Sequence, residues 1–150
     1  MVADVAPDAL VSVAIVDGPL PEPDAWRPVD AGAIVVFEGV VRPREAGRRL
    51  AALWYEDYEP MTRQELEKLV QEVFDARVLL GLRLEHSRGR VPVGGCSFRL
   101  RIASEHRQAA LLATAELIDR MKQHVPLWKR PEWLDADPAD EVESDPCRTR

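Results

Sequence analysis

The architecture follows from the stretch Cys96–Arg107, which reads C-S-F-R-L-R-I-A-S-E-H-R. Its first nine residues alternate between apolar and polar side chains, a pattern that predicts a strand with one face against a core. The inward set is Cys96, Phe98, Leu100 and Ile102, and the outward set is Ser97, Arg99 and Arg101. A strand that runs straight into a helical pattern indicates a mixed α and β architecture.

The longest predicted helix follows directly, over Glu105–His124. Ser104 is its expected N-cap, because a serine hydroxyl can accept a hydrogen bond from the first turn. Glu105, His106 and Arg107 would then lie in that turn, where free N–H groups, an imidazole and a guanidinium can together hold a phosphate. The alternative is structural: Glu105 offsets the helix dipole, and His106 and Arg107 are solvated.

The remaining pattern predicts the α+β class, with a mixed or antiparallel sheet packed against two main helices in a single domain with short extra elements. A second helix is expected over Met61–Ala76, with Thr62 and Glu65 as a capping box. The segment Ala33–Val41 is almost continuously apolar, which is typical of a strand covered on both faces. Further strands are expected over Leu10–Val16, Leu50–Tyr58 and Leu80–Arg88, with a short helix at Ala25–Arg27 and a turn at Val91–Gly95.

Composition favours an ordinary globular protein: of 150 residues, 46% are hydrophobic and 31% charged. No apolar run approaches the roughly 20 residues of a membrane span, and the first residues lack the basic segment of a signal peptide. The two cysteines, Cys96 and Cys147, lie far apart and lack C-x-x-C spacing, so they support neither a disulfide framework nor a zinc site. We therefore expect a cytoplasmic location and no membrane partner.

The net charge of −6 is unevenly distributed. From Glu132 onward there are seven acids and two arginines, so we expect a disordered acidic tail over residues 135–150, beyond a domain spanning residues 1–134. From Arg99 to Arg130 seven Lys or Arg residues accompany three acids, which indicates a local anion site. A nucleic-acid partner is not expected, because the chain has no broad basic face and no interleaving of aromatic and basic residues.

Lysine is rare in this chain: of twenty basic residues only Lys68, Lys122 and Lys129 are lysines. Two of them lie seven residues apart in M-K-Q-H-V-P-L-W-K-R. Lysine can lose its proton and act as a base or nucleophile, which arginine does not do at ordinary pH. The alternative is again structural, with Lys122 stabilising a helix C-terminus and Lys129 following an anchoring Trp128.

Arginine, tryptophan and histidine residues are further candidates for the site. Arg42 ends the apolar strand, where functional side chains often lie, but it also fits a solvated turn. Trp128 and Trp133 flank Lys129 and either wall a pocket for a flat ring or pin the chain to the core. His86 and His124 have no partner at metal-ligand spacing and receive no role.

Four motifs occur in order: G-A-I-V-V-F-E-G-V-V-R at Gly32–Arg42, Y-E-P-M at Tyr58–Met61, S-E-H-R at Ser104–Arg107 and M-K-Q-H-V-P-L-W-K-R at Met121–Arg130. Together they resemble the large, catalytic subunit family of molybdopterin synthase, and the resemblance spans roughly Leu10 to Trp133. It implies a sulfur transferase that converts cyclic pyranopterin monophosphate to molybdopterin by forming its dithiolene.

The resemblance also implies the partners and the site. Sulfur would come from the C-terminal thiocarboxylate of a small ubiquitin-like carrier subunit, and a central homodimer with two carriers would form a heterotetramer. By motif, Lys122 and Lys129 match the catalytic lysines, and Arg42, His106 and Arg107 match residues that bind the phosphorylated pterin substrate. No metal or other cofactor is implied. The alternative function is a non-catalytic binding module for a ubiquitin-like tail or a phosphorylated ligand.

One departure from the family pattern concerns position 131. An acidic residue usually follows the W-K-R motif, whereas this chain has Pro131 and then Glu132. Whether Glu132 takes over the acidic role stays open at this point.

The spacing of two site residues predicts a shared site. Arg107 and Lys122 lie on one predicted helix, about 22 Å apart at 1.5 Å per residue. We therefore expect the phosphate-binding residues and the reactive amine to meet across a two-fold interface. Lys122 is expected to lie nearest the thiocarboxylate and to accept its acyl group transiently, and Lys129 to handle protons or charge on the pterin side.

Overall fold

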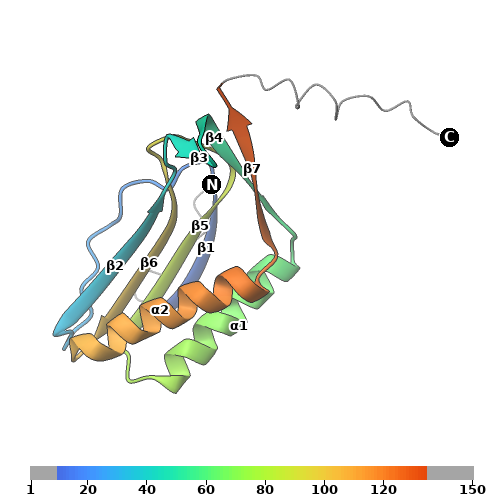
Figure 1. Cartoon of the computed structure of the whole chain (residues 1–150). Coiled ribbons are helices and arrows are strands. Elements are labelled where there is room, and N and C mark those ends of the chain that lie inside the picture. The colour runs from blue at the N-terminus through green and yellow to red at the C-terminus, as the bar shows by residue number, and fades with distance from the viewer. Residues whose placement is uncertain (1–9, 135–150) are drawn as a thin grey trace.

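The computed structural model describes residues 10–134, which form one seven-stranded sheet and two helices (Figure 1). The elements are β1 (Val11–Asp17), β2 (Ala33–Val40), β3 (Arg44–Glu45), β4 (Arg48–Asp57), α1 (Met61–Ala76), β5 (Gly81–Pro92), β6 (Cys96–Ser104), α2 (Arg107–His124) and β7 (Leu127–Trp133). The predicted class, α+β with two main helices on a mostly antiparallel sheet, is confirmed. The predicted acidic tail at 135–150 lies outside the described residues. Neither described helix is long and apolar enough to cross a membrane.

Strand β5 is the centre of the sheet. Its first half pairs with β6 on one side, antiparallel, and with β1 on the other, parallel. Its last residues leave these neighbours and pair with β4 instead. Strand β4 also carries β7 and the short β3, and β2 pairs with β6. The long β5 therefore links the helix-covered part of the sheet to the part that holds β4 and β7.

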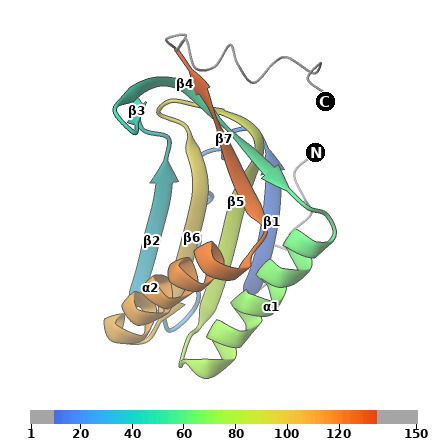
Figure 2. The same ribbon diagram turned by 45° about the vertical axis from the view of Figure 1, so that its right-hand side comes forward.

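Both helices cover the same face of the sheet (Figure 2). The predicted inward residues Leu100 and Ile102 of β6 are fully buried there, together with Leu84 of β5. They pack against the inner sides of the two helices, at Leu66 of α1 and Leu117 of α2. The structure thus confirms that the face of β6 with Leu100 and Ile102 meets the core, as the alternation predicted.

The opposite face of the sheet is also buried. Arg99 is only 2% exposed, and Arg101 is held by Asp24, whose carboxylate accepts a hydrogen bond of 2.8 Å from Nη1. The ring of Trp26 lies over the guanidinium of Arg83 at 4.9 Å. The segment 18–32 therefore covers Arg83 and Arg101 as an extended strap, and the short helix expected at 25–27 is not formed.

Two expectations about strands are wrong. Strand β2 is not covered on both faces: it pairs only with β6 among the described strands, and Val36 and Phe37 are 53% and 39% exposed. Strand β7 was not expected, because Pro126 comes directly before it and Pro131 interrupts its pattern. It forms nonetheless, since β7 pairs on one side with β4 and a proline on an edge strand need not donate a ladder hydrogen bond.

Two expectations about helix starts are also wrong. Helix α2 begins at Arg107 with His106 at the N-cap, because Ser104 still belongs to β6 and its hydroxyl donates to the His106 carbonyl at 2.6 Å. Thr62 forms no capping box. Its hydroxyl accepts from the Tyr58 N–H at 2.7 Å and donates to the Pro126 carbonyl at 2.8 Å, which ties the start of α1 to the link between α2 and β7.

Candidate functional site

Lys122 and Lys129 line the same two adjoining cavities. Lys122 lies near the C-terminal end of α2, and Lys129 lies on β7, which follows α2 after a short link. The β7 strand returns along β4, so that Tyr55 is the register partner of Lys129. The predicted pair of amines is therefore brought together by the turn from helix to strand.

The larger cavity, of about 500 Å³, is here called the apolar groove. Its apolar walls are Phe37, Phe98, Ile118, Met121, Val125, Leu127 and Trp128. Trp128 stands at the rim, as the pocket alternative for this residue predicted. Trp133 does not line the groove: it packs on a separate apolar cluster, with the guanidinium of Arg48 over its ring at 4.1 Å.

The smaller cavity, of about 240 Å³, is here called the cationic pocket. It is lined by the charged residues Arg42, Arg44, Glu45, Lys122 and Lys129. Four cations accompany one carboxylate, so the pocket favours a multiply charged anion such as a phosphate. Arg42 thus lies with the lysines, as the family resemblance implies.

A pair of hydroxyls marks the border between the two cavities. Tyr55 and Ser97 line both of them, as do the two lysines. The Tyr55 hydroxyl donates to Ser97 Oγ at 2.9 Å, and Ser97 Oγ donates to the Gly39 carbonyl at 3.3 Å. Any molecule that spans groove and pocket must therefore pass the lysines and this hydroxyl pair.

The acid next to Lys129 is Glu45. Its Oε1 lies 2.5 Å from Lys129 Nζ. Glu132 lines neither cavity. Arg90 and Trp54 donate hydrogen bonds to its carboxylate and hold the pKa of Glu132 at about 2. Glu132 therefore does not take over an acidic role beside Lys129.

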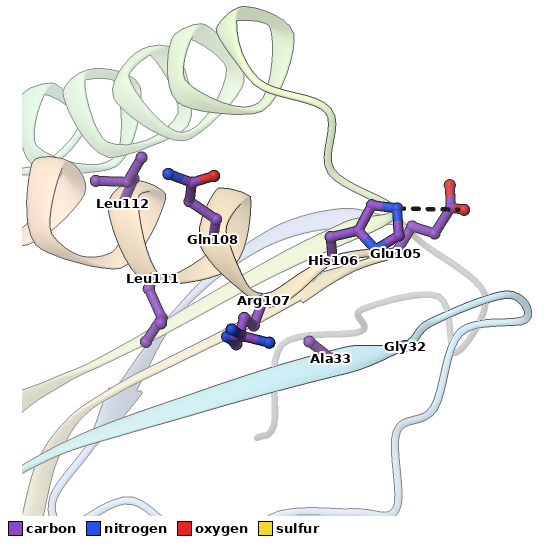
Figure 3. A pocket seen from close by; sticks show the side chains of 8 residues that line it. All are labelled: Gly32, Ala33, Glu105, His106, Arg107, Gln108, Leu111 and Leu112. Atoms are coloured by element: carbon purple, nitrogen blue, oxygen red, sulfur yellow. Dashed lines mark ion pairs between the residues drawn. The ribbon is translucent and has the colours of Figure 1, made fainter.

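His106 and Arg107 lie at the opposite end of α2, in a third cavity of about 830 Å³ (Figure 3). Arg107 extends towards Ala33 of β2, whereas His106 and Glu105 extend past the start of the helix. His106 Nε2 is 3.6 Å from Glu105 Oε1, and the imidazole is 85% exposed. Within one chain, the structure therefore does not bring these two residues to Arg42 and the lysines.

Gly32 allows the start of β2 to lie close to the start of α2. Its N–H donates to the Ser104 carbonyl at 3.0 Å. A Cβ at this position would lie 2.2 Å from the Glu105 carbonyl oxygen, which is backbone and cannot move aside cheaply. The motif glycine is thus required for the close approach that forms the third cavity.

His86 lies at the base of the apolar groove, although we expected no role for it from the sequence. It is 5% exposed, and burial lowers the pKa of its imidazole. The strand alternation that places Leu82 and Leu84 inward also places His86 inward, and this signal was available in the sequence. Glu45, Tyr55 and Ser97 carried no comparable signal, because they reach the site only through strand pairing.

The comparisons with known proteins agree with one another. A family model described as "MoaE protein" matches residues 21–124. The molybdopterin synthase catalytic subunit of Oryza sativa subsp. indica is 38% identical over 107 residues, which cover 71% of this chain and 55% of the rice protein. The chain thus spans about half the length of that relative. The protein of the same name from Thermoplasma volcanium is 38% identical over 104 residues, or 69% of this chain and 76% of that protein.

The fold has a solved counterpart. The crystal structure of a molybdopterin synthase from Staphylococcus aureus superposes with a TM-score of 0.71 at 28% sequence identity. The superposition covers 81% of this chain and 91% of that chain.

Proposed function

The chain belongs to the MoaE protein family, and from this premise we propose that it is the catalytic subunit of a molybdopterin synthase. It transfers sulfur to cyclic pyranopterin monophosphate and forms the dithiolene of molybdopterin. The sulfur donor is the C-terminal thiocarboxylate of a small ubiquitin-like carrier subunit. The observation that carries the proposal is the position of Lys122 and Lys129 at the border between an apolar groove and a cationic pocket.

The two cavities suit the two reactants. The cationic pocket, with Arg42 and Arg44, binds the phosphate of the pterin by charge-assisted hydrogen bonds. The apolar groove receives the thin, flexible tail of the carrier between Phe37, Ile118 and Trp128. The reacting sulfur and the pterin carbon then meet beside the two lysines.

The lysines supply charge and protons at this meeting point. Lys122 lies on α2 next to the groove wall and acts on the thiocarboxylate, where an ammonium stabilises the oxyanion that forms as the acyl carbon becomes tetrahedral. Lys129 lies beside Glu45 in the cationic pocket and handles protons or charge on the pterin side as the cyclic phosphate opens.

Each sulfur transfer forms one bond for each bond that it breaks. The thiocarboxylate sulfur forms a C–S bond to the pterin side chain while a C–O bond breaks there. Water then adds to the acyl carbon, the acyl C–S bond breaks, and the carrier tail leaves as a carboxylate. Two such transfers complete the dithiolene, so two carrier molecules are consumed for each product.

A second copy of the chain completes the site in this proposal. Its His106 and Arg107 would reach the phosphate from across a two-fold axis, because in one chain they lie at the far end of α2, about 22 Å from Lys122. The apolar side chains around them support a contact surface, since Leu111 and Leu112 line the same cavity and are exposed. The homodimer is therefore a requirement of the site.

The test is direct reconstitution. The purified chain is mixed with a thiocarboxylated carrier and the cyclic pterin, and mass spectrometry follows the dithiolene product. We expect product in proportion to the carrier consumed. No product, under conditions in which a known synthase is active, would overturn the proposal, and binding of both reactants without turnover would identify a binding module.

A further inference from the structure

His86 is held rigidly at the base of the apolar groove. It lies on β5 opposite Phe98 of β6, whose ring is 5.8 Å away, and the Tyr55 ring meets it edge-on at 5.3 Å. With 5% of the residue exposed, the imidazole cannot turn over without displacing these neighbours. The orientation of its two nitrogens is thus set by the fold.

The tautomer of His86 is set by its neighbour in the chain. Nδ1 lies 2.7 Å from the carbonyl oxygen of Ser87. Because a carbonyl oxygen only accepts, Nδ1 must carry the hydrogen. Burial lowers the pKa of the imidazole, so the ring is neutral at pH 7. It follows that Nε2 carries a lone pair and no hydrogen.

This lone pair accepts no hydrogen bond within residues 10–134, where the ring's hydrogen bond is the one from Nδ1 to Ser87 and the Asp57 carboxylate acts on the ring through its charge alone. Nε2 is nevertheless not sealed inside the protein, because it is not among the fully buried side-chain atoms of that range that lack a hydrogen bond. The cavity that His86 lines is the apolar groove. Nε2 therefore presents an unused acceptor to whatever enters the groove.

We propose that Nε2 of His86 accepts a hydrogen bond from a planar, amide-type N–H of the molecule that fills the apolar groove. The groove's other polar groups do not duplicate this function: the lysines are donors, and the Tyr55 and Ser97 hydroxyl hydrogens are already given to Ser97 and the Gly39 carbonyl. An inserted molecule without such an N–H would leave a buried acceptor unmatched, so His86 selects for it.

The inference rests on the proposed function for the identity of the ligand, because the apolar groove is the cavity that receives the carrier tail. The backbone of that tail offers peptide N–H groups. The hydrogen bond at His86 can be observed in a binding experiment, without turnover.

Nitrogen-15 NMR of the imidazoles tests it, since the chain has only three histidines, His86, His106 and His124. In the free protein we expect His86 alone to show a protonated Nδ1 and an unprotonated Nε2 locked in one tautomer. The probes are the intact carrier with an ordinary carboxylate end and, separately, the cyclic pterin. The carrier should shift Nε2 to lower frequency with little change at Nδ1, and the cyclic pterin should leave Nε2 unmoved.

Several outcomes overturn the proposal. One is a free protein in which Nε2 carries the hydrogen. Another is an Nε2 signal that the carrier does not move, or that only the cyclic pterin moves, although the indole N–H signal of Trp128 at the groove rim shows saturation with the carrier. If product forms in the reconstituted reaction but Nε2 does not respond, the inference fails alone. If Nε2 responds but no product forms, the proposed function fails and the hydrogen bond stands.

Two variants separate the acceptor from the ring. His86→Phe keeps a flat ring without an acceptor, and His86→Gln keeps an acceptor without the ring. We expect His86→Phe to weaken binding of the responding probe about tenfold, with KM changed more than kcat, and His86→Gln to restore most of the affinity. His124→Phe is the matched control, because His124 lies outside groove and pocket. Equal losses in His86→Phe and His86→Gln would show a packing role only, and the NMR readout remains if His86→Phe does not fold.

Discussion

Lys129 Nζ and Glu45 Oε1 lie 2.5 Å apart, although 84 positions separate the two residues in the chain. The pair joins β7 to the β3–β4 hairpin at the mouth of the cationic pocket. An ion pair on the surface contributes little to stability. In the proposed function its consequence is chemical, because it puts a carboxylate beside an amine that lines the cationic pocket.

The first prediction concerns Lys122. We expect Lys122→Ala to lower kcat by about 10²–10⁴-fold, because a positioned proton-transfer or charge-stabilising group contributes that much. Lys122→Arg should remain impaired, since the larger, planar guanidinium keeps the charge but does not place it where the compact ammonium does. The rate of product formation with thiocarboxylated carrier measures both. The control is Lys68→Ala on α1, which removes a lysine that lines neither groove nor pocket; near-normal turnover by Lys122→Ala would exclude a catalytic role.

Glu45 gives the second prediction. Glu45→Gln removes the one negative charge from a pocket with four cations, so a phosphorylated substrate should bind more tightly. We expect KM to fall about threefold at low ionic strength and the difference to shrink as salt screens the pocket. Steady-state kinetics at two salt concentrations test this. Glu67→Gln, the same charge change at an exposed position on α1, is the control, and a raised KM in Glu45→Gln alone would contradict the expectation.

The third prediction concerns the shared site. Arg107→Ala and Lys122→Ala proteins should each be inactive as homodimers, whereas a hybrid dimer contains one intact site. After random exchange of subunits, we expect about a quarter of wild-type activity, because half of the dimers are hybrids and each has one working site of two. Activity is measured after mixing, and mass spectrometry of the intact dimers confirms exchange. Confirmed hybrids without recovered activity would place Arg107 outside the partner's site.

The fourth prediction is a pH dependence of stability through His86. Burial lowers the folded-state pKa of His86 below the ordinary 6.5. The unfolded chain therefore binds more protons than the folded chain just below pH 6.5, and the free energy of unfolding must fall as the pH falls. The His86 contribution is fully present above 6.5 and is lost as the pH drops towards the folded pKa, by at most about 1.4 kcal/mol per pH unit.

Urea unfolding at pH 7.5 and pH 5.5 measures this effect. His86→Gln, which has no titrating group, should lose less stability between the two pH values than the wild type. His124→Gln serves as the control, because it removes an exposed histidine. Equal pH dependence in wild type and His86→Gln would show that His86 is protonated in the folded state at the same pH as in the unfolded chain.

Much of the fold was predictable where a pattern is long and regular. The helix Met61–Ala76 and the strand Cys96–Ser104 were predicted with the bounds that the structure has. In both, one set of side chains at a constant period meets a single buried face, so local spacing carries the information. The strand β7 was missed because Pro131 breaks such a pattern, and only pairing with β4 makes it a strand.

The chain's own order of residues establishes which groups are available: two lysines at the end of a long helix, an arginine after an apolar strand, and a His-Arg pair at the other helix end. Spacing along α2 even shows that these groups cannot all meet within one chain. Three-dimensional packing selects the neighbours. Glu45 reaches Lys129, Tyr55 and Ser97 border both cavities, and His86 lies beneath them, because β4 pairs with β7 and with the end of β5. Such pairings join distant segments through backbone hydrogen bonds that every residue type except proline can make, and so no local pattern encodes them.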